Sequence, residues 1–305
     1  VVRDVRGVVQ KCRASVVGIV TESYQSFSQT SAGSGFIISE NGYIVTNNHV
    51  ISGGDSITVV LENGDSYVAY VIGTDEITDI AVLKIEADDL TAIELGDSDT
   101  VEVGEAAVAI GNPTGQLMGT VTTGVISGVN RNIMVDNNIM TLLQTDAAIN
   151  AGNSGGALLN VNGEVIGINS RKTSGSTSSG STIEGIGFAI PINDVKDIVE
   201  ELIATGTITR PGLGITGQEV HFSNMDPGIL VVSVNEGSPA EAAGMKQMDI
   251  ITAIDGQQVT SFSSLQSVLY SHDVGDTVTI TVLRSGETLD LQVTLAEVAE
   301  SGTQE

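Results

Sequence analysis

The stretch INAGNSGGALLN places one serine, Ser154, among glycines and an asparagine, directly before an apolar run. A serine hydroxyl is a poor nucleophile at its own pKa, so it needs a base within hydrogen-bond reach and a group that orients the base. A tight glycine-rich turn can also aim backbone N–H groups at a developing oxyanion. The same stretch also fits a turn between two strands that carries no chemistry, so other residues have to decide between the two interpretations.

The base that a reactive serine needs is usually a histidine. The chain has three histidines, His49, His221 and His272, and only His49 falls in the same predicted unit as Ser154. His49 ends the strand-like run YIVTNNHVI, a position where a lone histidine is often only a surface residue. Because no other histidine shares this unit with the serine, His49 is the candidate base.

The group that orients the histidine should be a buried carboxylate. Asp79 comes directly before the mostly apolar run IAVLKI, so its backbone leads into a core. A buried charged aspartate is costly unless it is paired, and a histidine N–H is a suitable partner. Four other aspartates are weaker alternatives. Asp55, Asp65 and Asp75 lie in polar turns, and Asp146 lies close to the serine in the sequence, where it would brace the loop.

GNSGG also satisfies the G-x-S-x-G elbow of α/β-hydrolases. That elbow requires a helix directly after the serine, and the acid and the histidine must follow in the chain. Here ALLNVNGEVIGIN follows, which reads as a strand, an Asn-Gly turn and another strand. The order His49, Asp79, Ser154 is instead that of chymotrypsin.

Short β-type runs separated by turn signals extend from about residue 15 to 191, and Asn-Gly pairs indicate tight hairpins. About a dozen strands fall into two sets, and two antiparallel barrels fit them better than one sheet with long exposed edges. NDVKDIVEELIAT predicts a helix capped by Asn193 and ended by Gly206. The Ser/Gly/Thr-rich stretch 171–185 is expected to be a mobile loop.

A different pattern starts near Thr209, where strands alternate with two short helical segments around 239–243 and 263–271. This pattern predicts an independent α+β module. We therefore expect three parts: residues 1–205, residues 206–298, and a flexible acidic tail at 299–305.

Composition excludes several classes of function. The net charge of −26 argues against nucleic acid, because phosphate binding needs clustered Lys and Arg. The single cysteine, Cys12, excludes an intrachain disulfide and a cysteine-based zinc site. No apolar run approaches the ~20 residues that span a bilayer, and VVRDVRG is not a signal peptide, which leaves the compartment open.

TNNHV, DIAVLKI and GNSGGALLN occur in this order, accompanied by GSGFIIS, AIGNP, TDAAIN and GIGFAIP. On these motifs the first part resembles the trypsin-like serine proteases of the HtrA (Deg) family, and the second resembles the PDZ domain that follows them. The resemblance implies a mainly β fold, with two six-stranded antiparallel, chymotrypsin-like barrels followed by an α+β PDZ domain.

The resemblance also implies roles for particular residues. Ser154 is the expected nucleophile, His49 the base and Asp79 the residue that orients the base. The turn Gly152–Asn153–Ser154 is the expected oxyanion hole, with the N–H groups of Gly152 and Ser154 as donors. The primary specificity pocket, suited to a medium aliphatic P1 residue, is expected to be lined by Ile149, Gly185, Ile186, Gly187 and Phe188.

In the second part, RPGLGITG resembles a PDZ carboxylate-binding loop, with backbone N–H groups near Leu213, Gly214 and Ile215 capturing a peptide C-terminus. Leu265, Val268 and Leu269 would form the wall of an apolar pocket, or they simply fill the core of the module. Two positions depart from the family: Met248 stands where a glycine usually precedes Asp249, and Ala14 where a proline often stands.

The expected function is therefore ATP-independent endoproteolysis of misfolded or unfolded proteins in extracytoplasmic quality control and the stress response, with PDZ recognition of substrate C-termini. We expect no cofactor and no metal, and a homotrimer or a larger assembly. The expected location is periplasmic or at the cell surface, and a preceding segment could tether the protein to a membrane. The alternative is a peptide-binding scaffold or chaperone with a PDZ domain and a silent triad.

Overall fold

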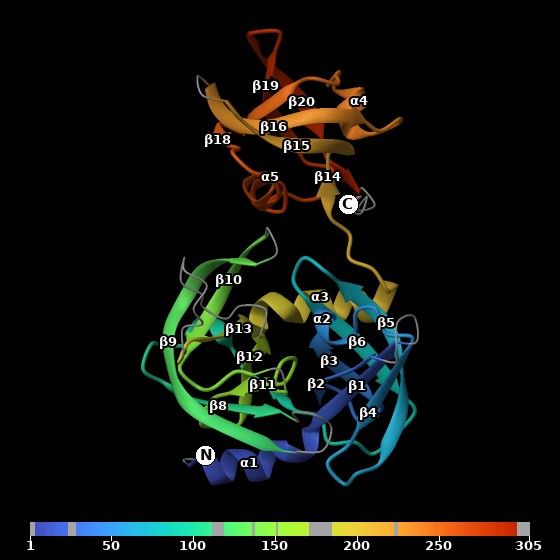
Figure 1. Ribbon diagram of the computed structural model, residues 1–305, viewed down its shortest axis with the longest axis vertical. Coiled ribbons are helices and arrows are strands. Elements are labelled where there is room, and N and C mark those ends of the chain that lie inside the picture. The colour runs from blue at the N-terminus through green and yellow to red at the C-terminus, as the bar shows by residue number, and fades with distance from the viewer. Residues whose placement is uncertain are drawn as a thin grey trace. The chain divides into compact units, whose positions relative to one another are not determined.

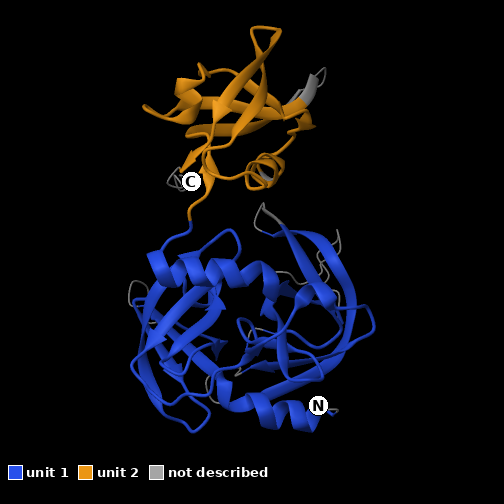
Figure 2. Ribbon diagram, turned by 180° about the vertical axis from the view of Figure 1, so that it is seen from behind, with its two compact units in different colours: residues 1–135, 140–208 blue, residues 136–139, 209–305 orange. Residues whose placement is uncertain are grey.

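The computed structural model describes residues 4–23, 29–111, 119–135, 138–150, 152–170, 185–222 and 225–297 (Figure 1). The expected mobile loop at 171–185 and the acidic tail fall almost wholly outside these residues. The chain divides into two compact units, Val1–Val135 with Met140–Ile208 and Asp136–Ile139 with Thr209–Glu305 (Figure 2). The predicted boundary after residue 205 stays a prediction.

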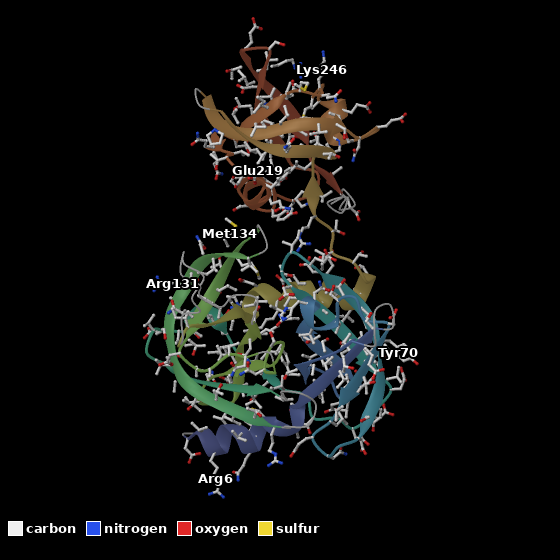
Figure 3. The ribbon with its side chains drawn as sticks, viewed as in Figure 1. Arg6, Tyr70, Arg131, Met134, Glu219 and Lys246 are labelled. Carbon is white, nitrogen blue, oxygen red and sulfur yellow. The ribbon has the colours of Figure 1, made fainter. Side chains whose placement is uncertain are left out.

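The first barrel is a closed antiparallel sheet in the order β1-β2-β3-β6-β5-β4. Its inward side chains, such as Ile19, Ile44 and Leu83, are fully buried in one cluster, whereas Tyr70 points outward and is 57% exposed (Figure 3). The strands are β1 (Val16–Ser23), β2 (Gln29–Ile37), β3 (Tyr43–Asn47), β4 (Ser56–Val60), β5 (Ser66–Asp75) and β6 (Ile80–Ile85).

Gly42 explains the tight turn between β2 and β3. It adopts a φ of 97°, and a Cβ added to it would lie 2.4 Å from the carbonyl oxygen of Ile85. Only glycine meets both conditions without strain, so the Asn-Gly hairpin signal here has a steric basis.

The second barrel has the order β11-β8-β9-β10-β13-β12 and closes because β11 also pairs with β12, while β7 adds to β12 in parallel. The prediction of two six-stranded antiparallel barrels is confirmed. The strands are β7 (Glu94–Leu95), β8 (Ala106–Gly111), β9 (Thr120–Val135), β10 (Asn138–Thr145), β11 (Ala157–Leu159), β12 (Glu164–Ser170) and β13 (Gly187–Pro191).

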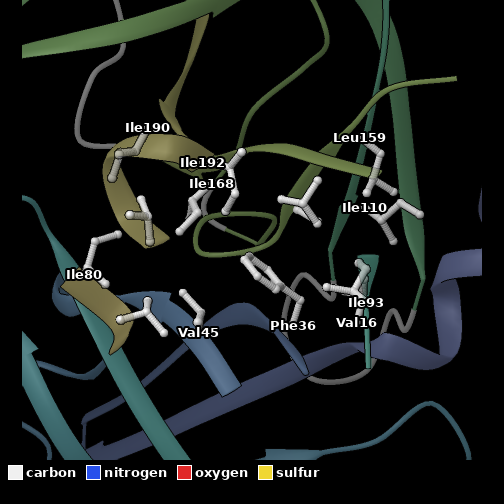
Figure 4. Close-up of a cluster of buried hydrophobic side chains, with 14 of the residues drawn as sticks. Val16, Phe36, Val45, Ile80, Ile93, Ile110, Leu159, Ile168, Ile190 and Ile192 are labelled. Carbon is white, nitrogen blue, oxygen red and sulfur yellow. The ribbon is translucent and has the colours of Figure 1, made fainter. Parts of the chain in front are cut away.

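One hydrophobic cluster joins the two barrels. It contains Phe36 and Val45 from the first barrel together with Ile110, Leu159 and Ile168 from the second (Figure 4). Burial of an aliphatic or aromatic side chain contributes about 1.5–3 kcal/mol, so this shared core holds the barrels in one fixed arrangement.

The helical segments described in the first unit are α1 (Val5–Cys12), η1 (Arg13–Ser15), α2 (Asn48–Ile51), η2 (Ser98–Thr100) and α3 (Ile192–Thr205). Helix α3 buries Val195, Val199 and Leu202 against the shared core and ends at Gly206, as predicted. The predicted cap was wrong. Helix α3 starts one residue before Asn193, whose amide instead donates to Asp97 Oδ1 at 2.7 Å.

The second unit is an α+β module whose sheet has the order β15-β16-β17-β19-β20. Its elements are β14 (Pro211–Gly212), β15 (Ile215–Phe222), β16 (Met225–Val234), α4 (Pro239–Ala242), β17 (Ile250–Ile254), β18 (Gln257–Gln258), α5 (Phe262–Leu269), β19 (Thr277–Arg284), β20 (Glu287–Thr294) and β21 (Ala296–Glu297). Among the described residues of the whole chain, no helix combines the length and apolar character needed to span a membrane.

Met248 occupies a position that suits glycine. Its φ is 72°, in the left-handed region, and its side chain is 68% exposed. The turn forms despite the substitution, because Met248 N–H donates to Val231 O and Val231 N–H donates to Asp249 O. The departure from the family therefore strains this turn without removing it.

Asp249 is fully buried and paired with Arg284. The Arg284 Nε and Nη2 atoms each donate to one carboxylate oxygen of Asp249 at 2.7 Å, and Lys246 N–H donates at 2.8 Å. Burial alone would raise the pKa of Asp249. The hydrogen bonds from Arg284 and Lys246, and their positive charges, outweigh burial and hold this pKa below the usual value of an aspartate.

We expect Arg284→Gln to lower the free energy of unfolding of the second unit by about 3 kcal/mol near neutral pH, because it leaves a buried charge unpaired. A carboxyl group with a lowered pKa contributes stability that is present above its unfolded pKa and is lost as the pH falls through its folded pKa. Because the pKa of Asp249 is lowered, the difference between wild type and variant should shrink in strong acid. Urea denaturation followed across pH measures it.

Arg13→Gln is the matched control for this experiment, because Arg13 pairs with Glu62 on the surface of the first unit. Exposed pairs contribute only about 0–1 kcal/mol. Equal small effects of both substitutions would contradict the stabilising role of the Asp249–Arg284 pair.

Candidate active site

His49 is positioned by the junction of β3 and α2. Strand β3 ends at Asn47, and the single turn α2 anchors itself through the buried side chains of Val50 and Ile51. The segment before the histidine is tied to Asp79, because Asn47 Nδ2 and the next backbone N–H both donate to the Asp79 carbonyl oxygen, at 2.9 and 3.0 Å. The imidazole is thereby fixed beside the aspartate.

Asp79 is the last residue of the turn between β5 and β6. It is 2% exposed and has a φ of 58°, a left-handed conformation that few residues other than glycine adopt. Its two carboxylate oxygens face the histidine. Oδ1 accepts the His49 backbone N–H at 2.9 Å, and Oδ2 lies 2.7 Å from His49 Nδ1.

Ser154 lies in the turn that leads into β11 (Ala157–Leu159). Its Oγ lies 3.0 Å from His49 Nε2, so the three predicted side chains meet across the two barrels. Ser34 of β2 braces the turn from the first barrel: its N–H donates to Ser154 O at 2.9 Å and its hydroxyl donates to Gly152 O at 2.6 Å. A Cβ added to Gly155 would lie 2.3 Å from Ser34 O, which requires glycine there.

The contacts fix the arrangement of protons. A carboxylate can only accept, so Nδ1 of His49 carries the proton shared with Asp79, and the lone pair of Nε2 faces the Ser154 hydroxyl. Of the rival carboxylates, Asp146 is exposed and accepts the N–H of Val125, a residue of β9, at 2.6 Å.

The turn predicted to form an oxyanion hole is folded on itself in this structure. The N–H groups of Asn153 and Ser154 both donate to the Asn150 carbonyl oxygen, at 3.0 and 3.2 Å. The Asn153 side chain closes the turn, because its Nδ2 donates to Ala148 O at 2.9 Å and its Oδ1 accepts Asn150 N–H at 2.8 Å. The Ser154 N–H can receive an oxyanion only after the Asn150 carbonyl turns away.

Of the expected pocket residues, the structure brings Gly187 of β13 close to Ile149. A Cβ added to Gly187 would lie 2.5 Å from Ile149 Cγ1, so these two residues are in contact. Gly185 has open space beside it, and Ile186 packs partly against the shared core. Phe188 is only 6% exposed and lies within that core, so the specificity pocket stays a prediction.

The side chains expected to form the groove wall, Leu265, Val268 and Leu269, lie in the core of the second unit, as does the side chain of Leu213 from the predicted carboxylate-binding loop. Leu213, Leu265 and Leu269 are 3–5% exposed and belong to one hydrophobic cluster, against which Ile215 packs. Their burial agrees with the interpretation that they fill the core, and their contact with a bound peptide stays a prediction.

Gly214, in the predicted carboxylate-binding loop, stands where a side chain would not fit. Its φ is 70°, and a Cβ added to it would lie 2.4 Å from the Cβ of Ser238. Its carbonyl oxygen accepts the Asn235 N–H at 2.9 Å. The loop is therefore held tightly against the segment that precedes α4.

Sequence reasoning missed Asn47, Ser34 and the side chain of Asn153. Asn47 and Ser34 are fully buried and Asn153 is 3% exposed, and all three hold the backbone around the triad rather than the reacting atoms. A polar residue at the end of an otherwise buried strand was the signal available for Asn47.

Comparison with known proteins places the chain in a family. The model of the trypsin-like peptidase domain matches residues 33–168, and that of the PDZ domain matches residues 211–295. The serine protease Do-like HtrA of Lactobacillus helveticus is 47% identical over 283 residues, which cover 87% of this chain and 68% of that protein. The chain belongs to the HtrA family of serine proteases. The resemblance seen in the sequence is confirmed.

Other relatives agree with the HtrA assignment. A probable periplasmic serine endoprotease, DegP-like, of Chlamydia trachomatis is 44% identical, covering 87% of this chain and 54% of that protein. The chain thus spans between about half and two thirds of the length of these two relatives. The solved structure of the HtrA-type protease AlgW with decapeptide has a TM-score of 0.75 and 32% identity, covering 96% of this chain and 98% of that one.

Proposed function

We propose that this HtrA-family chain is an endopeptidase in which Ser154 is the nucleophile, His49 the general base and Asp79 the residue that fixes the imidazole. The observation that carries the proposal is the unbroken series of contacts from Asp79 Oδ2 to His49 Nδ1, at 2.7 Å, and from His49 Nε2 to Ser154 Oγ, at 3.0 Å. These distances allow direct proton transfer along the path that nucleophilic catalysis requires.

In the first step Ser154 Oγ attacks the scissile carbonyl carbon while Nε2 of His49 takes the hydroxyl proton. The imidazolium then gives this proton to the leaving amine, and Asp79 stabilises its positive charge. The N–H groups of Gly152 and Ser154 receive the oxyanion once the turn opens. One such donor contributes about 10²–10³ in kcat, so opening of this turn belongs to the proposed catalytic cycle.

We assign unfolded and misfolded proteins as substrates, with the PDZ module binding their C-termini. Strand β15 lies at one edge of the described sheet and is preceded by the Leu213–Gly214 loop. An extended peptide can add to such an edge while backbone N–H groups bind its carboxylate. A related protease of solved structure is described with a decapeptide, which supports peptide recognition by this family.

The remaining parts of the proposal concern setting and assembly. Relatives named probable periplasmic endoproteases support an extracytoplasmic location, where we place a role in protein quality control. The sequence has no motif typical of a nucleotide-binding loop, which supports proteolysis independent of ATP. A homotrimer remains our expectation for the assembly.

Removal of residues 209–305 tests whether the first unit cleaves peptide bonds by itself and the second unit recruits protein substrates. The shortened chain should keep hydrolysing a small chromogenic peptide, because the triad and the shared core lie in the first unit. It should degrade unfolded casein at least about tenfold less efficiently, because the linked module raises the local concentration of substrate. Initial rates on both substrates measure this.

A chain that lacks only residues 298–305 is the control and should match the full chain on both substrates. Loss of peptide hydrolysis in the shortened chain would contradict an independent protease unit. If the full chain binds casein but degrades neither substrate, the alternative of a scaffold with a silent triad replaces the proposal.

A further inference from the structure

The turn that carries Asp79 is short and strained. Strand β5 ends at Asp75 and β6 begins at Ile80, and these two residues face each other in the sheet, so only four residues connect the strands. Asp79, the last of the four, has its φ of 58°. A non-glycine residue persists in this conformation only where its surroundings hold it there.

One side of Asp79 is held by the histidine segment. Its carbonyl oxygen accepts hydrogen bonds from Asn47 Nδ2 and Asn48 N–H, and its carboxylate faces His49. These contacts fix the aspartate from the side of β3. They do not involve the three residues before it, whose conformation decides where the carboxylate points.

The other side of the turn is organised by Asp75. This residue is 3% exposed, and its carboxylate accepts the N–H groups of Ile77 and Thr78 at 3.3 and 3.4 Å and the Thr78 hydroxyl at short range. A buried carboxylate is costly unless hydrogen bonds compensate it. These three donors belong to the turn itself, so the charge of Asp75 and the shape of the turn depend on each other.

We propose that Asp75 is a positioning residue for the catalytic pair. It acts through Asp79, by holding the turn in the conformation that directs the Asp79 carboxylate to Nδ1 of His49. The inference rests on the proposed function for its catalytic consequence, because proton transfer from Ser154 depends on the orientation of the imidazole. From the sequence alone, the polar context of Asp75 indicates only a turn residue.

The test uses the full chain with Asp75→Ala, Asp75→Asn and Asp65→Ala. Asp65 is the matched control, since it lies in the turn at the other end of β5 but is exposed, with Asn63 as its hydrogen-bond partner. We expect Asp75→Ala to lower kcat on a chromogenic peptide by about 10²-fold at unchanged KM, the scale of a displacement of about 1 Å in catalytic geometry. Asp75→Asn retains an acceptor oxygen and should restore most of kcat.

A second measurement does not depend on turnover. The proton between His49 Nδ1 and Asp79 gives a far-downfield NMR resonance, recorded in a Ser154→Ala background. We expect this resonance to broaden or disappear in Asp75→Ala, to persist in Asp75→Asn, and to stay unchanged in Asp65→Ala. A general loss of stability without a change in the turn would leave the resonance in place below the unfolding temperature.

The outcomes separate the two proposals. If folded Asp75→Ala keeps both its kcat and the resonance, the positioning role is overturned while the protease function stands. If wild type hydrolyses nothing but the resonance still responds to Asp75, the function fails and the positioning of the pair stands. Should Asp75→Ala not fold, Thr78→Val removes one hydroxyl donor at constant shape, and an unchanged resonance and kcat in that variant would equally overturn the inference.

Discussion

Replacing Ser154 by alanine should lower kcat for peptide and casein cleavage by a factor of about 10⁴ or more, because the substitution removes the nucleophile itself. The fold should be unaffected, since the turn is held through backbone atoms: Ser154 O accepts from Ser34 N–H, and Gly155 N–H donates to Asn169 O. Steady-state rates and thermal unfolding of the same preparations measure both expectations.

Ser66→Ala serves as the control for the loss of a hydroxyl, because Ser66 is exposed at the start of β5 in the same unit. Covalent labelling by a serine-directed phosphonate should modify wild type at residue 154 and leave the alanine variant unmodified. Equal cleavage by wild type and Ser154→Ala would refute the proteolytic proposal.

Asp79→Asn should produce the second large loss, about 10⁴ in kcat, without displacing the histidine. The structure supplies the reason. Because Asp79 Oδ1 accepts the His49 backbone N–H, the amide oxygen of an asparagine will face that N–H and its NH₂ group will face Nδ1. Nδ1 must then accept, so the proton moves to Nε2, and the imidazole can no longer take a proton from Ser154.

Nitrogen-15 NMR of the imidazole reports this change of tautomer directly, alongside the kinetic measurement. Asp146→Asn makes the same isosteric change at an exposed loop carboxylate of the first unit, so its kcat should stay close to that of wild type. Asp79→Asn with the tautomer and the rate of wild type would show that Asp79 does not orient His49.

Much of the site could be predicted because a few residue types carry the chemistry. Ser154, His49 and Asp79 were identifiable from their order, from the small number of histidines and from the apolar run after Asp79. The two barrels followed from hairpin signals such as Asn41–Gly42, where backbone conformation leaves little choice of residue.

What the sequence did not predict depends on contacts between distant segments. Nothing local to Ser34 shows that it binds the turn of Ser154, and a sequence cannot show which way the carbonyl of Asn150 points. The leucines of α5 have a helical spacing that suits a groove and a core equally, and only packing decides. The polar sequence around Asp75 indicated an ordinary turn residue and did not show that its side chain is only 3% exposed.

The division of the triad between two barrels has a consequence for biosynthesis. The first barrel contributes the acid and the base, whereas the nucleophile arrives on the second barrel, which is complete only when β13 closes it. A chain synthesised only as far as the first barrel lacks Ser154, and the shared core must form before the hydroxyl meets the imidazole. The proposed triad is therefore complete only in a chain that has folded through both barrels.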